Sequence, residues 1–138
     1  MAENPHAAAR RPRPLSPHLM HYQWPITMAT SITHRATGIA LAVGTLLVVW
    51  GILALASGEA AFAQFKTCIG SPLGLILLLG WSWALSYHLC NGVRHLVQDA
   101  GAGYAIPQFV RSSWLSVIGS IVLTAIIWAC VLAQGGAA

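Results

Sequence analysis

The sequence predicts an all-α membrane protein with three transmembrane helices. Hydrophobic residues make up 57% of its 138 residues and charged residues only 7%, and its mean hydropathy is +0.68. A soluble domain ordinarily carries about 25% charged residues. Most of the apolar residues gather in three uncharged runs, each of about 20 residues, which is the length that a helix needs to cross a bilayer. These observations exclude a disordered chain and an ordinary soluble enzyme.

Residues 1–30 are expected to form a cytoplasmic and interfacial segment. The opening stretch MAENPHAAARRPRP is basic and rich in proline, and it lacks the apolar region of a secretory signal. Its arginine cluster (Arg10, Arg11 and Arg13) places the N-terminus in the cytoplasm by the positive-inside rule. The net charge of +4 is modest and gives no reason to expect a nucleic acid as partner.

Residues 31–138 are expected to form the transmembrane domain, with helices over about 31–57, 70–98 and 110–134. The segment between the first two helices is interpreted as a loop. Small residues recur along the second helix, so another helix could approach it closely. Because three helices alone bury few polar side chains, we expect a second membrane subunit to complete the bundle.

Ionisable residues in these helices are candidate functional residues, because charges are costly inside a bilayer. One group opens the first helix and another lies at the end of the second, so the topology brings both to the cytoplasmic edge. The groups are Ser31, His34 and Arg35, and His88, Arg94, His95 and Asp99.

His88 is a candidate ligand of a haem iron. At 100° per residue, His88, Asn91 and His95 share one stripe of the second helix, and Arg94 lies off it. His88 and His95 are about 10 Å apart along the helix axis, which matches the span from a haem iron to its propionates. The residue pattern also allows His88 to make a polar contact across the bundle, and both interpretations stay open.

A haem in this chain would be bound non-covalently, because the three cysteines form no CxxCH motif. They form no CxxC zinc pair either. A haem held by two histidines needs a second ligand, which we expect from a partner chain. His18, His21 and His34 are the alternatives within the chain, although they precede or open the first helix and better suit the level of the propionates.

Ser31 and Arg35 are candidate quinone-binding residues. They lie one helical turn apart, where a hydroxyl donor beside a permanent cation suits a quinone carbonyl, a haem propionate or a lipid phosphate. The alternative is that Arg35 extends to lipid headgroups while Ser31 bonds to its own helix. Trp24, just before Pro25, is a candidate wall for the quinone ring.

Two segments resemble signatures of the cytochrome b membrane-anchor subunit of succinate dehydrogenase, also called complex II. The first is RPLSPHL (Arg13 to Leu19) followed by SITHRATG (Ser31 to Gly38), and the second is HLCNGVRHLVQDAG (His88 to Gly101). With the three-helix layout, the resemblance spans nearly the whole chain. It departs at Gln98, where the family usually has an aromatic residue or Met, so we expect altered local packing there.

The resemblance implies roles for the candidate residues. His88 would ligate the iron of haem b, with the second histidine supplied by the small anchor subunit. Ser31 and Arg35 would line the ubiquinone site, and His34, Arg35 and His95 would lie near the haem propionates.

The resemblance also implies the partners, which are a flavoprotein subunit, an iron–sulfur subunit and a small hydrophobic membrane anchor. FAD and the iron–sulfur clusters would belong to those subunits, so this chain would carry no succinate-oxidising site. Arg94 and Asp99 would be structural, as an ion pair or as contacts with the soluble subunits. A bacterial inner membrane is the expected location, with the mitochondrial inner membrane as the alternative. Three other functions stay open: a fumarate reductase-type anchor, a haem-free structural anchor that would not need His88, and an unrelated multipass protein such as a transporter accessory subunit.

Overall fold

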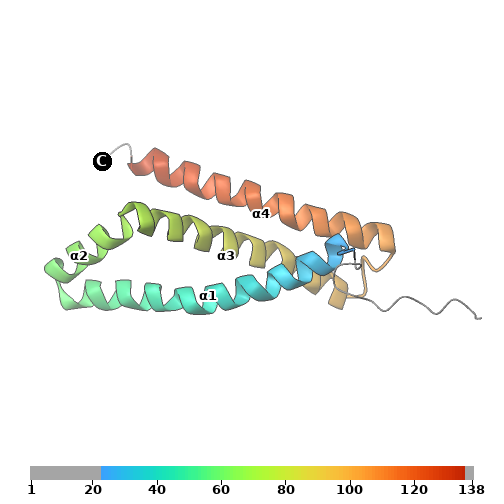
Figure 1. The fold of residues 1–138 in the computed structure, drawn as a ribbon, viewed down its shortest axis with the longest axis horizontal. Coiled ribbons are helices and arrows are strands. Elements are labelled where there is room, and N and C mark those ends of the chain that lie inside the picture. Colours follow the sequence, from blue (N-terminus) through green and yellow to red (C-terminus); the bar gives the residue numbers. More distant parts are fainter. Residues whose placement is uncertain (1–22, 136–138) are drawn as a thin grey trace, which may run out of the picture.

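The structure, a computed structural model, describes residues 23–135. These residues form four helices, which are α1 (Ile26–Ser57), α2 (Glu59–Ile69), α3 (Pro72–Asp99) and α4 (Ile106–Gly135). No strand occurs within the described range. Helices α1, α3 and α4 are each long and apolar enough to span a membrane. The expected all-α fold with three transmembrane helices is therefore confirmed (Figure 1).

Some of the sequence-based predictions fall on residues 1–22 and 136–138, which lie outside the described range. They concern the basic N-terminal cluster, His18, His21 and the motif Arg13 to Leu19. The cytoplasmic location of the N-terminus and the division of the chain at residue 30 likewise stay predictions.

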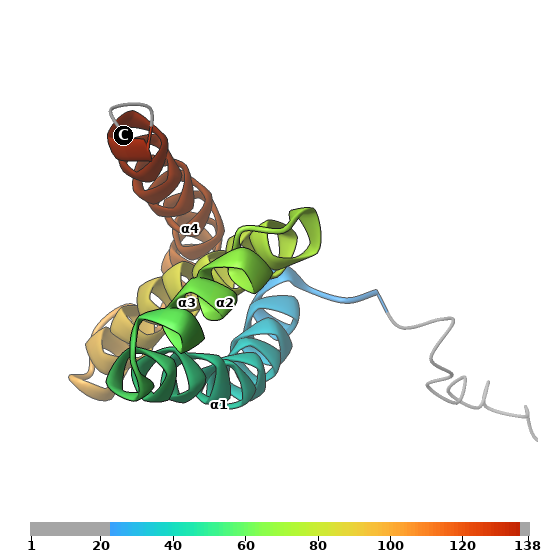
Figure 2. The same cartoon turned by 90° about the vertical axis from the view of Figure 1, so that its left-hand side faces the viewer.

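Helix α3 is the central element of the bundle, with contacts to both α1 and α4 (Figures 1 and 2). At one end of the bundle α1 begins, α3 ends and α4 begins, and we call this the proximal end. The opposite, distal end holds α2 and the last turns of α1 and α4 (Figure 1). Helix α4 diverges from α1 toward the distal end, as the end-on view shows (Figure 2).

Helix α1 begins at Ile26, about five residues earlier than the sequence predicted. Pro25 stands at its N-cap in an extended conformation (φ −67°, ψ 150°), and a proline there fits the entry to a helix because it has no N–H to satisfy. Ser31 therefore lies in the second turn of α1 and not at its start.

The predicted loop between the first two spans is mostly helix α2, of 11 residues. Gly58, with φ 115°, makes the sharp turn from α1 into α2, a conformation that strains residues with a Cβ. Glu59 in the first turn and Lys66 in the last suit the helix dipole. Phe65 packs edge-on against Trp50, with ring centroids 4.8 Å apart. These two charges interrupt the apolar run, so hydropathy alone did not predict this helix.

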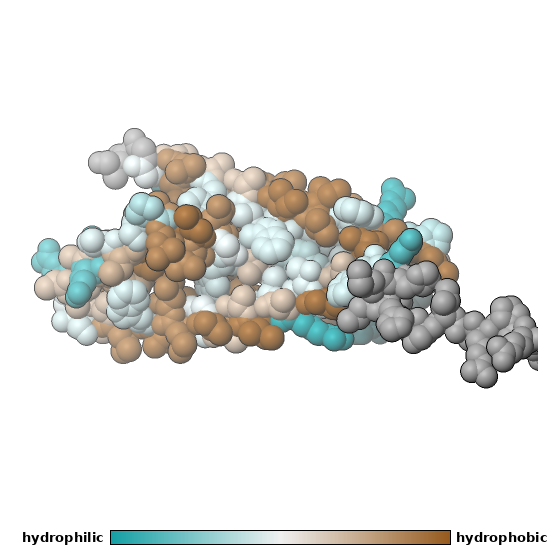
Figure 3. Space-filling model, in the orientation of Figure 1, coloured by the Kyte–Doolittle hydropathy of each residue, from teal (hydrophilic) through white to brown (hydrophobic). Residues whose placement is uncertain are grey.

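The interior of the bundle is polar, and its outside is apolar. Only Ala54, Ala84 and Tyr87 are buried hydrophobic residues among those described. The buried polar residues are Thr30, Thr37, Ser86, Asn91, Arg94, Gln98, Ser113, Ser116, Ser120 and Thr124. Large aliphatic and aromatic side chains cover much of the surface along the bundle (Figure 3). This distribution fits lipid or another membrane subunit as the surroundings, since apolar side chains need no burial there.

Small residues allow the helices to approach one another. A Cβ at Gly44 of α1 would overlap the indole of Trp81 on α3, and a Cβ at Gly74 would overlap the carbonyl oxygens of Cys68 and Ile69 in α2. Ser71 caps α3 by accepting a hydrogen bond from the Gly74 amide at 3.1 Å. Backbone atoms of α2 therefore fill the space beside Gly74, and unlike a side chain they cannot rotate away.

Gly74→Ala is expected to destabilise the protein by about 1–3 kcal/mol, because the new methyl group meets backbone carbonyls. Gly80→Ala is the matched control on the same helix, since nothing lies within 4 Å of a Cβ at Gly80. The control should be neutral or stabilising by up to about 1 kcal/mol, because alanine favours helix. Thermal unfolding midpoints in detergent micelles measure both, and equal midpoints for the two variants would contradict the packing argument.

Candidate functional site

Three histidines from two helices meet at the proximal half of the bundle. The rings of His34 on α1 and His88 on α3 stack with centroids 4.0 Å apart and planes 10° apart. His95, two turns along α3 from His88, meets His34 edge-on at 5.1 Å. The structure thus brings together His34, His88 and His95, which the sequence assigned to one site.

The imidazole of His88 is held by α1. Its Nδ1 lies 3.2 Å from the carbonyl oxygen of His34 and 3.4 Å from the hydroxyl of Thr37. A carbonyl oxygen can only accept a hydrogen bond, so Nδ1 of His88 carries the proton in its contact with the His34 carbonyl. The other ring nitrogen, Nε2, then keeps its lone pair. A backbone carbonyl on one nitrogen and a free lone pair on the other is the usual arrangement of a histidine that ligates a metal.

Two glycines leave room around this cluster. A Cβ at Gly38 would lie 3.1 Å from Cε1 of His88, so a larger residue there would press on the imidazole. A Cβ at Gly92, one turn along α3 from His88, would come within 3.9 Å of Nε2 of His34. That His34 nitrogen is buried and has no hydrogen-bond partner among the described residues.

The chemistry of these histidines fits a haem iron. The stacked ring of His34 covers the face of the His88 ring, whereas the Nε2 lone pair points outward in the ring plane, so stacking leaves it free. The unpartnered His34 nitrogen is a further polar group that a bound ligand would satisfy. Among the described residues no group of three or more His, Cys, Asp or Glu could hold a metal ion alone.

Arg94 belongs to a buried polar network and does not face away from the bundle. Its Nε donates to Ser112 on α4 at 3.0 Å, and its Nη1 donates to Asn91 at 3.3 Å. The amide nitrogen of Asn91 lies 3.2 Å from Nε2 of His95. The helical wheel put Arg94 off the functional stripe because it considered α3 alone, and the contact with α4 makes that second face an interior one. Asp99 is exposed and is not among the hydrogen-bond partners of Arg94.

Tyr87 and Thr37 are two site residues that sequence reasoning missed. The Tyr87 side chain is 2% exposed, and its hydroxyl donates to the carbonyl of Thr30 at 3.1 Å. Thr37 packs its hydroxyl against Nδ1 of His88. A signal for Tyr87 was its place beside His88, since a tyrosine amid an apolar run usually needs a partner for its hydroxyl.

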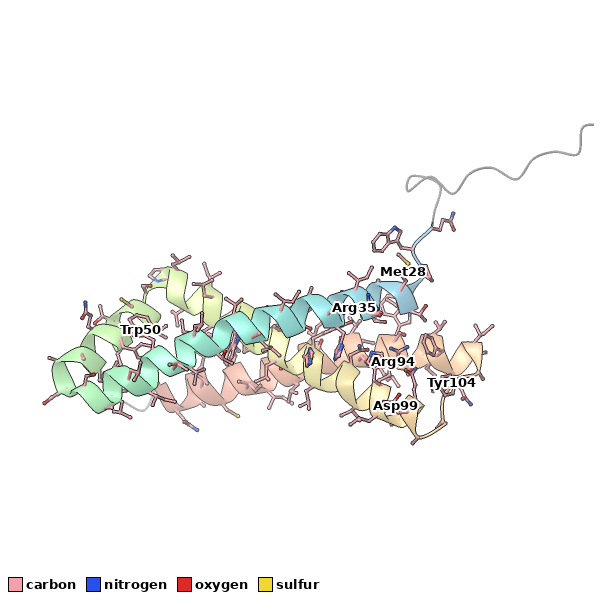
Figure 4. The ribbon with its side chains drawn as sticks, turned by 90° about the horizontal axis from the view of Figure 1, so that it is seen from below. Met28, Arg35, Trp50, Arg94, Asp99 and Tyr104 are labelled. Carbon is pink, nitrogen blue, oxygen red and sulfur yellow. The ribbon has the colours of Figure 1, made fainter. Side chains whose placement is uncertain are left out.

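The candidate quinone residues lie at the proximal end but outside the histidine cluster. Arg35 is exposed, like Trp24 at 54%, and Ser31 is half-buried. The hydroxyls of Thr30, Thr33 and Thr37 donate to carbonyls of α1, and no such bond is found for Ser31 among the described residues. Figure 4 shows Arg35 and Arg94 at the same end of the bundle on different helices.

Known proteins are similar to this chain over most of its length. Residues 9–127 match the family described as succinate dehydrogenase/fumarate reductase transmembrane subunit. The chain is 47% identical over 111 residues to the succinate dehydrogenase cytochrome b556 subunit of Paracoccus denitrificans, which covers 80% of this chain and 85% of that protein. It is 39% identical over 116 residues to the b556 subunit of Rickettsia felis, covering 84% and 90%. Against the mitochondrial cytochrome b560 subunit of Mus musculus it is 40% identical over 128 residues, covering 91% and 70%.

Tyr87→Phe is expected to lower the free energy of unfolding by about 1 kcal/mol, because it removes the hydrogen bond from α3 to the Thr30 carbonyl. Tyr104→Phe is the matched control, since Tyr104 is 62% exposed. Thermal unfolding in micelles distinguishes the two variants, and a Tyr87→Phe midpoint no lower than that of the control would show that this bond does not hold α1 to α3.

Proposed function

Because this chain belongs to the succinate dehydrogenase/fumarate reductase transmembrane subunit family, we propose that it works as a haem-binding and quinone-binding anchor of a succinate dehydrogenase. In this role it holds haem b jointly with the small membrane-anchor subunit and docks the flavoprotein and iron–sulfur subunits. Electrons from succinate then reach ubiquinone beside this chain. The two soluble subunits carry FAD and the iron–sulfur clusters, and succinate is oxidised there.

The observation that carries the haem proposal is the orientation of His88. A carbonyl of α1 engages its Nδ1, and the free Nε2 would bind the haem iron. The small anchor subunit supplies the second histidine. When bound, the haem would accept and return single electrons, at a potential that its axial ligands and surroundings adjust.

The edge of the haem carries propionates, and three residues of the proximal half suit them. His34 has a buried, unpartnered Nε2, and Arg35 beside it is a permanent cation. His95 lies about 10 Å beyond His88 along α3. These residues would orient the carboxylates of the haem toward the membrane edge.

Ser31, Arg35 and Trp24 would form this chain's share of the quinone site. No hydrogen bond of the Ser31 hydroxyl is found within residues 23–135, so it could donate to a quinone oxygen, and Arg35 would stabilise negative charge that develops on that oxygen during reduction. Trp24 would cover the ring. The exposure of Arg35 and Trp24 suits a pocket that another subunit completes.

The chain is a multi-pass membrane protein, and its relatives come from bacteria and mitochondria, consistent with an inner membrane. We propose the bacterial inner membrane, with the N-terminus in the cytoplasm. This orientation rests on the excess of arginine in residues 1–30, and it turns the proximal end toward the soluble subunits.

His88→Ala is expected to abolish the b-type haem band in a dithionite-reduced-minus-oxidised spectrum of the purified complex, because the iron loses an axial ligand. Ser57→Ala, at the distal end of α1 and away from the histidine cluster, is the control and should keep the band. An unchanged band in the His88 variant, or the same loss in both variants, would refute the assignment of His88.

Ser31→Ala and Arg35→Gln are each expected to lower succinate–ubiquinone reduction roughly 10- to 100-fold, the effect of losing one donor to a developing oxyanion. Succinate oxidation with an artificial electron acceptor should stay unchanged in both, because it does not use this chain.

The controls for these two variants replace the same residue types elsewhere. Ser57→Ala lies at the distal end of α1, and Arg111→Gln is exposed on α4. Full ubiquinone reduction by the Ser31 and Arg35 variants would exclude these residues from the quinone site.

A further inference from the structure

Thr37 is a buried residue of α1 whose side-chain oxygen contacts both its own helix and α3. Its side chain is 4% exposed. The hydroxyl lies 2.9 Å from the carbonyl oxygen of Thr33 and 2.9 Å from that of His34, and 3.4 Å from Nδ1 of His88. Because a carbonyl oxygen only accepts, the one hydroxyl proton of Thr37 is shared between these two carbonyls. The oxygen of the hydroxyl therefore presents a lone pair to His88.

The Nδ1–H group of His88 accordingly has two acceptors on α1. One is the carbonyl oxygen of His34 at 3.2 Å, and the other is the hydroxyl oxygen of Thr37. If the proton sat on Nε2 instead, the lone pair of Nδ1 would face the lone pairs of the His34 carbonyl. Both contacts thus favour the same tautomer, with the proton on Nδ1 and the lone pair on Nε2.

The imidazole of His88 has little freedom to find another acceptor. The ring of His34 stacks on its face, and a Cβ at Gly38 would lie only 3.1 Å from its Cε1 atom. Because Thr37 is buried within a membrane-spanning bundle, no bulk water competes for the Nδ1–H group there. Removing the hydroxyl would therefore leave the His34 carbonyl as the acceptor that remains among the described residues.

The second acceptor affects a metal bound at the other nitrogen of the ring. A hydrogen bond accepted from one nitrogen of a ligating histidine fixes the orientation of the ring and makes the lone pair of the other nitrogen a stronger donor to the metal. A stronger nitrogen donor stabilises ferric iron relative to ferrous iron, so it lowers the reduction potential of a haem.

We propose that Thr37 is a positioning residue that holds His88 as the Nδ1–H tautomer and lowers the reduction potential of the haem. The inference rests on the proposed function, because it takes His88 as the ligand of the haem iron. Thr37 acts through His88 and does not itself reach the iron. Unlike the carbonyl of His34, which every residue type would supply, the hydroxyl is a side-chain group, so a single substitution at position 37 changes the potential while the ligand stays in place.

The test is a potentiometric titration of the haem at one pH, followed by its visible spectrum, in the complex of this chain with its co-purifying subunits. Thr37→Val has nearly the same shape and removes the hydroxyl. At the midpoint potential of the native haem, the ratio of reduced to oxidised haem should rise about 3- to 10-fold in this variant, the effect of losing one neutral hydrogen bond. Thr37→Ser keeps the hydroxyl and should restore the native ratio.

Thr45→Val is the matched control for this titration. Thr45 is exposed on the same helix, and its hydroxyl donates to the carbonyl of Ala42, so the ratio should not change. A merely structural role of Thr37 would lower the amount of bound haem and leave the potential of the remaining haem unchanged, and that result would overturn the proposal.

A second variant keeps the test decisive if Thr37→Val fails to assemble. Thr37→Ala removes the hydroxyl without adding a methyl group beside the imidazole, and it should raise the ratio in the same direction. A native complex without a b-type haem band would refute the proposed function and this inference together. A native band with an unchanged or lower ratio in the variants without the hydroxyl, or with no recovery in Thr37→Ser, would refute this inference alone.

Discussion

The proximal half of this bundle depends on two hydrogen bonds from α3 to main-chain carbonyls of α1. Tyr87 donates to the carbonyl of Thr30 and His88 to that of His34. The donors are neighbours on α3 and the acceptors are four residues apart on α1, so together they fix both the register and the rotation of the two helices. In a bilayer no water competes for these donors, and an unmade bond would leave a polar group in hydrocarbon. The stacking of His34 on His88 follows from this register.

The fold could be predicted from the sequence because hydropathy and length decide it. Three uncharged runs specify three spans, and the structure has them. Helix α2 was missed because Glu59 and Lys66 interrupt its apolar residues. Its packing depends on the contact of Phe65 with Trp50 of α1, which a local sequence pattern does not predict. The start of α1 was placed late because Pro25 is compatible with both a loop and a helix N-cap.

The histidine cluster could be predicted from the spacing on α3 and from a topology that turns α1 and α3 toward the same end. The burial of Arg94 could not be predicted, because it depends on the approach of Ser112 and Phe109 from α4. The periodicity of α3 alone does not tell where another helix packs against it. From the sequence, Gln98 was predicted only to alter the local packing. In the fold this residue lines a cavity between α3 and α4 together with Arg94, and its amide nitrogen is buried without a partner among the described residues.

Side-chain hydrogen bonds join α4 to α3 near the two ends of α4. Its hydroxyls at Ser113, Ser116, Ser120 and Thr124 all bond to carbonyls of α4 itself. Its side-chain hydrogen bonds to α3 come from Ser112 at one end and Trp128 near the other, about 24 Å apart along the helix. Between these two points α4 makes no side-chain hydrogen bond to α3 among the described residues, so the contact of the two helices there rests on the close fit of their side chains.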